Sequence, residues 1–129
     1  IQISFESRAG GMNVVFNPNK FSRIIENILS NSIKFTGEKG FISVILSGTR
    51  TKALISISDN GVGIPESLLG KVFDQFTEAG RSGTKGEVSV GMGLSIVKEQ
   101  IEAVGGKVWI ESKEGVGTTV FMEFPIIEQ

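Results

Sequence analysis

The sequence contains no cysteine and no histidine. Without cysteine, the chain cannot form disulfides or use a thiol as a nucleophile. Without either residue, it cannot build the usual structural zinc sites or a catalytic triad that depends on imidazole. A metal ion bound by this chain would therefore be a hard cation held by oxygen ligands, such as magnesium.

The sequence also lacks a strong charge of either sign and a long apolar run. Its 13 basic and 14 acidic residues give a formal net charge of −1, which offers no broad attraction to nucleic acid or to an anionic membrane. No apolar run approaches the roughly 20 residues of a membrane-spanning helix. Because the chain starts inside an apparent strand, at Ile1 and without methionine, we expect a single domain, residues 1–129, cut from a longer protein.

Hydrophobic periodicity predicts a mixed chain of helices and strands. Long helices are predicted from Asn17 to about Thr36 and from about Gly91 to Val104, where Gly105 and Gly106 end the second one. Shorter helices and the strands, which alternate in polarity, are predicted as follows: helices after Pro65 and over 71–76, and strands over 2–7, 12–16, 41–47, 53–59, 107–112 and 118–124.

The predicted strands come in consecutive pairs, the first of them a hairpin of 2–7 with 12–16. This order predicts an α/β fold class, a two-layer α/β sandwich whose mixed, mostly antiparallel sheet carries its helices on one face.

Asp59 does not fit the strand in which it lies. Side chains alternate along a strand, so Ile55, Ile57 and Asp59 share one face. A carboxylate on a buried face needs a partner. That partner is either the backbone of the turn at Asn60 and Gly61 or a ligand such as adenine, whose amino group donates a hydrogen bond where guanine carries a carbonyl.

Three polar side chains of the first long helix fall at the border of its buried face. Asn27, Asn31 and Lys34 lie within about 60° of one another around the helix. They could form an ordinary solvated helix edge. Alternatively, the amide oxygens could coordinate magnesium while the lysine neutralises phosphate charge.

Two further stretches have both a structural and a functional interpretation. The glycines of Gly91-Met92-Gly93-Leu94-Ser95 could simply make the start of a helix flexible, or they could let a phosphate approach its free amides. Phe73 and Phe76 are expected to anchor the chain in the core before a long loop, residues 77–90. Such anchoring is also what a moving loop needs.

The stretches NILSNSIKFT, DNGVGIP, VFDQF and GMGLSIVK resemble, in this order, the N, G1, F and G2 boxes of the histidine-kinase catalytic and ATP-binding domain. This domain belongs to the ATPase superfamily that includes gyrase-type topoisomerases and heat-shock chaperones. The resemblance extends from Lys20 to Pro125, and it implies the Bergerat-type form of the α/β sandwich.

The resemblance implies ATP and Mg²⁺ as cofactors. The resemblance implies that Asn31 is the magnesium ligand, with Asn27 beside it. It also implies that Lys34 contacts phosphate and that Asp59 binds the adenine amino group. It implies that residues 77–90 form the ATP lid. The other positions implied to shape the pocket or contact the nucleotide are Gly61, Gly63, Phe76, Gly91, Met92, Gly93, Leu94 and, through water, Thr118. Many relatives carry glycine where this chain has Ser89, so we expect a somewhat stiffer lid hinge.

The resemblance also favours phosphoryl transfer over hydrolysis. ATPases of the superfamily place a glutamate general base one helical turn before the magnesium asparagine. Here that position is Asn27, which cannot take a proton, and Glu26 points about 100° away. Water needs such a base, whereas a neutral imidazole already offers a lone pair. We therefore expect a protein-histidine kinase that acts by positioning and charge neutralisation, without a covalent catalytic residue.

Because this chain has no histidine, the acceptor histidine is expected on a separate dimerisation domain of the parent sensor kinase. A response regulator is expected downstream in a two-component system. We expect no contact with nucleic acid and no direct contact with a membrane. We expect the isolated domain to be a monomer and to be cytoplasmic, whether or not the parent is anchored in a membrane. Two alternatives stay open: an anti-sigma-type serine kinase, and a nucleotide-sensing module without phosphotransfer.

Overall fold

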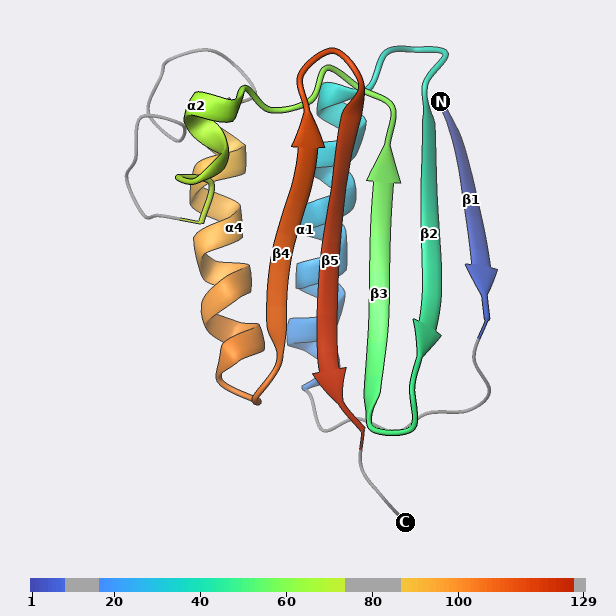
Figure 1. The fold of residues 1–129 in the computed structure, drawn as a ribbon, viewed down its shortest axis with the longest axis vertical. Helices are drawn as coiled ribbons and strands as arrows, with labels where there is room; N and C mark the ends of the chain where they lie inside the picture. Colours follow the sequence, from blue (N-terminus) through green and yellow to red (C-terminus); the bar gives the residue numbers. More distant parts are fainter. Residues whose placement is uncertain (9–16, 74–86, 127–129) are drawn as a thin grey trace.

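The computed structural model describes residues 1–8, 17–73 and 87–126, with side chains described outside 87–93. Figure 1 shows the order of its helices and strands. They are β1 (Gln2–Ser7), α1 (Pro18–Phe35), β2 (Phe41–Gly48), β3 (Lys52–Asp59), α2 (Glu66–Leu69), α4 (Glu87–Glu102), β4 (Lys107–Lys113) and β5 (Gly117–Pro125).

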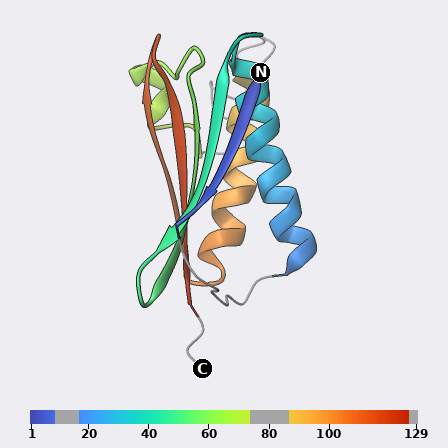
Figure 2. The ribbon, with the colours of Figure 1, turned by 90° about the vertical axis from the view of Figure 1, so that its right-hand side faces the viewer.

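The strands form one sheet in the order β1-β2-β3-β5-β4. The edge strand β1 pairs in parallel with β2, and the other neighbours are antiparallel. Figure 2 shows α1 and α4 side by side on one face of this sheet. The predicted two-layer sandwich with a mixed, mostly antiparallel sheet is therefore confirmed. The predicted strand 12–16, and with it the first hairpin, lies outside the described residues.

Helix α1 forms where its sequence predicts it. The side chain of Asn17 caps the helix by accepting hydrogen bonds from the backbone N–H groups of Asn19 and Lys20, at 2.8 and 3.2 Å. Pro18 follows at the first helical position, where its missing N–H costs nothing. The apolar stripe buries Ile24 and Ile28 against the sheet. This packing orients the border residues beside the stripe.

Helix α4 begins at Glu87, one turn earlier than the predicted start at Gly91. An acidic residue in a first helical turn is favourable, and glycine lowers helix propensity by only about 1 kcal/mol per residue. The burial of Leu94, Val97 and Ile101 on one face outweighs that cost. Gly91 and Gly93 consequently lie inside hydrogen-bonded turns, so the prediction that they form the free start of the helix is wrong.

The end of α4 agrees with the sequence. Gly105 has a positive φ of 82°, and its N–H bonds to the carbonyl of Glu102, while the N–H of Gly106 bonds to the carbonyl of Ile101, both at 3.0 Å. This is the Schellman pattern of a helix terminated by glycine.

The predicted short helix after Pro65 is α2. Of the predicted helix 71–76, residues 71–73 form a turn, and the rest lies outside the described residues.

The core lies between the sheet and the two long helices. Ile57 on β3 is fully buried, together with Ile28 of α1, Ile101 of α4 and Phe124 of β5. Asp59 follows Ile57 on the same face, at the end of β3, and is partly buried. In the part of the chain that the structure describes, no helix is both long enough and apolar enough to cross a membrane.

Candidate functional site

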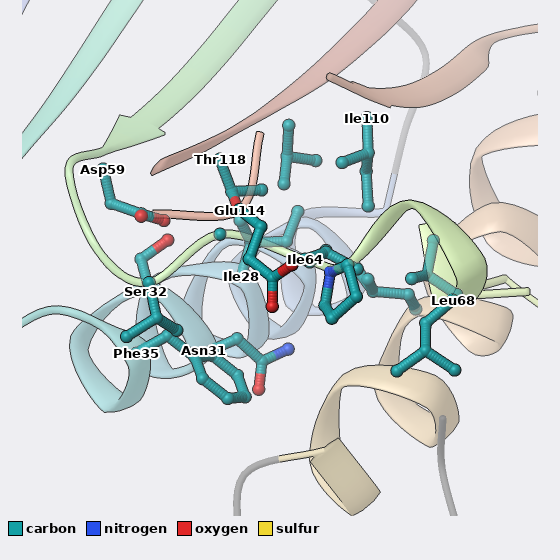
Figure 3. Close-up of a pocket in the computed structure, with 16 residues that line it drawn as sticks. Ile28, Asn31, Ser32, Phe35, Asp59, Ile64, Leu68, Ile110, Glu114 and Thr118 are labelled. Carbon is teal, nitrogen blue, oxygen red and sulfur yellow. The ribbon is translucent and has the colours of Figure 1, made fainter. Parts of the chain in front are cut away.

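A cavity of about 200 Å³ opens at the end of the sheet where β3 finishes and β5 begins. Its walls are mainly apolar, and they come from α1, α2, α4, β4, β5 and the segment after β3. The described polar side chains among them are those of Asn31, Ser32, Asp59, Glu114 and Thr118. Figure 3 shows Asp59 and Asn31 on different sides of this space. A mostly apolar cavity with a few polar groups is typical of a small-molecule site.

Asp59 occupies one end of the cavity, and three donors hold its carboxylate. The backbone N–H of Gly61 donates to Oδ1 at 2.9 Å, and the backbone N–H of Thr118 and the hydroxyl of Ser32 also donate to the carboxylate. Burial raises the pKa of Asp59 above its ordinary value of 3.8, and the three hydrogen bonds partly oppose that rise. The backbone of the turn and a ligand such as adenine can therefore both be partners of Asp59, because the hydrogen bond from the turn leaves further acceptor positions on the carboxylate.

Thr118 lies beside Asp59 because the two residues pair across β3 and β5. Its hydroxyl is hydrogen-bonded to the hydroxyl of Ser112 on β4, with the oxygens 2.8 Å apart. The Ser112 hydroxyl also accepts from the backbone N–H of Ile64 at 2.8 Å and donates to the carbonyl of Gly117 at 3.0 Å. One serine therefore joins the segment after β3 to the start of β5.

Gly61 and Gly63 allow this segment to approach two neighbouring parts of the chain. The N–H of Val62, between them, bonds to the carbonyl of Phe35 at 3.1 Å, and its carbonyl accepts from Gly115 at 2.7 Å. A Cβ at Gly61 would lie 2.2 Å from the Phe35 carbonyl oxygen, and one at Gly63 would lie 2.2 Å from that of Lys113. Gly63 also has a positive φ of 74°. Only glycine fits at both positions.

The three polar residues of α1 occupy different environments. Asn31 is buried, with 9% of its surface exposed, and lines the cavity. Its Nδ2 atom is buried and has no hydrogen-bond partner among the described residues. Asn27 is partly buried and Lys34 is exposed, and neither lines the cavity. The structure thus brings Asn31 and Asp59 to one space and leaves Asn27 and Lys34 at its margin.

The site contains few candidate metal ligands. In residues 1–8, 17–73 and 87–126, no group of three or more acidic, histidine or cysteine side chains could hold a metal ion. The protein would therefore contribute amide oxygens, and most ligands would come from water and from a bound phosphate, as is usual for magnesium. Asn31 is the buried amide that lines the cavity, so its side-chain oxygen is the candidate ligand; its atom without a partner among the described residues is Nδ2, which donates hydrogen bonds and does not bind a cation.

The remaining predicted site residues lie on or near α4. Leu94 is buried and lines the cavity. Gly91, Met92 and Gly93 belong to the first turns of α4, where side chains are outside the description. Phe76 and most of the predicted lid, residues 77–90, lie outside the described residues, and its last four positions are helical.

Three residues of the site were not predicted from the sequence. Ser32 is a polar residue on the buried face of α1, and this signal, the same one that identifies Asp59, could have found it. Glu114 and Ser112 give no such signal. Figure 3 shows the Glu114 side chain directed into the cavity from the turn between β4 and β5, and only the folded chain reveals that position.

Comparison with known proteins gives one consistent family. Residues 16–128 match the model of the histidine kinase-, DNA gyrase B- and HSP90-like ATPases. The sensor histidine kinase WalK of Bacillus subtilis is 35% identical over 118 residues, which are 90% of this chain and 19% of that protein. The chain thus spans about a fifth of the length of this relative.

Two solved structures of the histidine kinase ThkA are similar to this chain. Its nucleotide-free catalytic domain has a TM-score of 0.80 and 32% identity, covering 96% of this chain and 79% of that one. ThkA in complex with the response regulator protein TrrA has a TM-score of 0.75 and 29% identity, covering 97% of this chain and 34% of that one. The arrangement of helices and strands around the cavity is therefore that of histidine-kinase catalytic domains.

Proposed function

Because the chain belongs to the family of histidine kinase-, DNA gyrase B- and HSP90-like ATPases, we propose that it is the ATP-binding catalytic domain of a two-component sensor histidine kinase. In this role it transfers the γ-phosphate of ATP to a histidine on a separate dimerisation domain of the same parent protein. The observation that supports this function best is the Asp59 carboxylate, which three donors hold at one end of a mostly apolar cavity.

The cavity suits a purine. Ile28, Ile110 and Leu68 provide apolar surface for the flat ring, and Asp59 offers an acceptor at the end of that surface. A carboxylate has more acceptor positions than the hydrogen bond from the Gly61 N–H uses. A position that remains would accept the hydrogen that the amino group of adenine supplies. This pairing favours adenine over bases with a carbonyl at the same place.

Polar side chains of α1 are the proposed ligands of the phosphates and of magnesium. Asn31 is the proposed magnesium ligand, Asn27 supports it from the preceding helical turn, and Lys34 reaches phosphate from the exposed side. Bound magnesium would neutralise part of the charge on the phosphates. The protein's own contribution is to hold the nucleotide in one orientation and to surround its base with apolar side chains.

Hydrolysis is disfavoured because the position for a general base carries Asn27. Glu26, the neighbouring carboxylate, is exposed on another side of α1. An amide cannot take a proton from water, whereas a histidine acceptor in its neutral form needs no base at this place. The arrangement therefore suits transfer to an imidazole nitrogen that is brought to the γ-phosphate from outside this domain.

The proposed partners follow from this chemistry. The acceptor lies on a dimerisation domain of the parent, and a response regulator takes the phosphoryl group from it; the ThkA–TrrA complex is a relative in which such a kinase is seen with its regulator. The domain is proposed to act in the cytoplasm, as a monomer when isolated, without contacts to nucleic acid or to the membrane.

Incubation of the full-length parent protein with γ-labelled ATP and Mg²⁺ tests this function. The expected product is a label on the parent that is lost in acid and kept in alkali, as phosphohistidine is. The Asp59→Asn parent should stay unlabelled. An acid-stable label on a separate small protein would instead indicate a serine kinase, and nucleotide binding without any label would indicate a sensing module.

A further inference from the structure

The hydroxyl of Ser112 makes three hydrogen bonds, which is all that a hydroxyl can make. It has one proton and two lone pairs. The proton goes to the carbonyl oxygen of Gly117 at 3.0 Å, and one lone pair accepts from the N–H of Ile64 at 2.8 Å. The third contact, at 2.8 Å, is to the hydroxyl of Thr118. Since Ser112 has no second proton, Thr118 must be the donor in this contact.

The direction of this bond changes what Thr118 presents to the cavity that it lines. Its only hydroxyl proton points away to Ser112, so its oxygen can accept a hydrogen bond but cannot donate one. The hydroxyl proton of Ser32 is likewise used, because Ser32 donates to Asp59. Around Asp59, the described side chains therefore offer acceptors and no free hydroxyl proton. A ligand group that donates fits this end, and one that only accepts does not.

We propose that Ser112 is a positioning residue that fixes the direction of the Thr118 hydroxyl proton and thereby sets the preference of the cavity for an amino-substituted purine over an oxo-substituted one. This inference rests on the proposed nucleotide-binding function. Ser112 does not line the cavity; it acts through Thr118. Without it, the Thr118 proton is free to turn toward the cavity, where it can donate to the carbonyl of an oxo-purine.

The test compares ATP with ITP, which differ at this position by an amino group and a carbonyl. Calorimetry with Mg²⁺ gives the ratio of the ITP and ATP dissociation constants for each variant. In Ser112→Ala this ratio should fall about tenfold, the effect of one net hydrogen bond, because ITP gains a donor. Ser112→Thr keeps the hydroxyl and should keep the wild-type ratio.

A double-variant cycle separates this role from a purely structural one, because Ser112 also holds Ile64 and Gly117. Thr118→Val removes the hydroxyl while keeping the branched shape. In that background, Ser112→Ala should leave the ratio unchanged. If Ser112→Ala alone weakens ATP and ITP by the same factor, Ser112 only supports the backbone and the proposal is wrong.

The remaining outcomes also decide the question. Should Ser112→Ala fail to fold, Ser112→Cys replaces the hydroxyl by a thiol, a weak donor and acceptor, and must lower the ratio; an unchanged ratio overturns the proposal. If the wild-type domain binds neither ATP nor ITP, the proposed function fails. If it prefers ATP but Ser112→Ala keeps the ratio, only the role of Ser112 fails.

Discussion

Asp59 and Thr118 lie directly opposite one another on the antiparallel strands β3 and β5, and the backbone N–H of Thr118 donates to the Asp59 carboxylate. The pairing continues through both strands, down to Lys52 and Pro125. The position of the carboxylate is therefore set by the sheet as well as by the turn that follows it. A site held in this way loses little freedom when a ligand binds, which favours affinity.

Asp59→Asn should change how the stability of the free domain depends on pH. Burial raises the pKa of Asp59 in the folded chain, so its contribution to stability is fully present below 3.8, the ordinary value, and is lost as pH rises through the higher folded value. Asparagine does not titrate. The free energy of unfolding of the variant, relative to wild type, should therefore rise with pH from about pH 4 upward.

Urea denaturation of both proteins at several pH values measures this difference. The other carboxyl groups are the same in the two proteins, so their contributions cancel. If the difference in the free energy of unfolding stays constant with pH, or falls as pH rises, the surroundings of Asp59 do not raise its pKa.

Gly63→Ala should destabilise the fold more than Gly115→Ala. Both glycines have a positive φ, 74° and 83°, but a Cβ at Gly63 would meet the Lys113 carbonyl oxygen at 2.2 Å, and one at Gly115 has nothing within 4 Å. Gly115→Ala should therefore cost about 1–2 kcal/mol for the backbone conformation alone. Gly63→Ala adds a clash to the same cost.

Thermal and urea unfolding of the two variants measure the comparison, with Gly70→Ala as the control. Gly70 has a φ of −70° and open space around it, so alanine there should change stability by no more than about 1 kcal/mol. Equal losses of stability in Gly63→Ala and Gly115→Ala would mean that Gly63 does not lie in close contact with the Lys113 carbonyl.

Asn31→Ala should remove the part of the ATP affinity that depends on magnesium. Asn31 is buried and lines the cavity, where its amide oxygen is the proposed magnesium ligand. The loss with Mg²⁺ should be at least about tenfold, as changes around metal ligands usually are, whereas affinity measured in EDTA should hardly change. Asn27→Ala, at the partly buried position one turn earlier, is the matched variant and should lose less.

Titrations of ATP with and without Mg²⁺ separate the two contributions. If Asn31→Ala weakens binding by the same factor under both conditions, Asn31 contacts the nucleotide directly or supports the cavity, and the proposed magnesium position is wrong.

Local patterns in the sequence were enough to predict much of this molecule. Asn17 and Pro18 predict the start of α1, Gly105 predicts the end of α4, and alternation before Asp59 predicts its inward direction. Each of these features depends on residues close in sequence. The sequence predicts a start of α4 at Gly91, four residues later than the observed start at Glu87, because Gly91 and Gly93 weaken local helix propensity, whereas the burial of Leu94 and Val97 that favours the helix is a tertiary effect.

The contacts that complete the site join distant parts of the chain. Ser112 contacts Ile64, 48 positions away. That Thr118 donates the hydrogen bond to Ser112 follows only from counting all the partners of Ser112. Ser32 reaches Asp59 only after α1 packs on the sheet. The pattern of buried positions could indicate Ser32 as a site residue, but no periodicity or spacing shows that Ser32 pairs with Asp59 or that Ser112 pairs with Ile64 and Thr118.

The central claim, that Asp59 binds the adenine base of ATP, is tested most directly by calorimetric titration of the wild-type and Asp59→Asn domains with ATP and Mg²⁺. The matched control is Glu111→Gln, which removes an exposed carboxylate on β4. We expect wild type and Glu111→Gln to bind alike, and Asp59→Asn, with an unchanged circular dichroism spectrum, to lose at least about a hundredfold in affinity. Binding by a folded Asp59→Asn domain as tight as that of wild type would contradict the account.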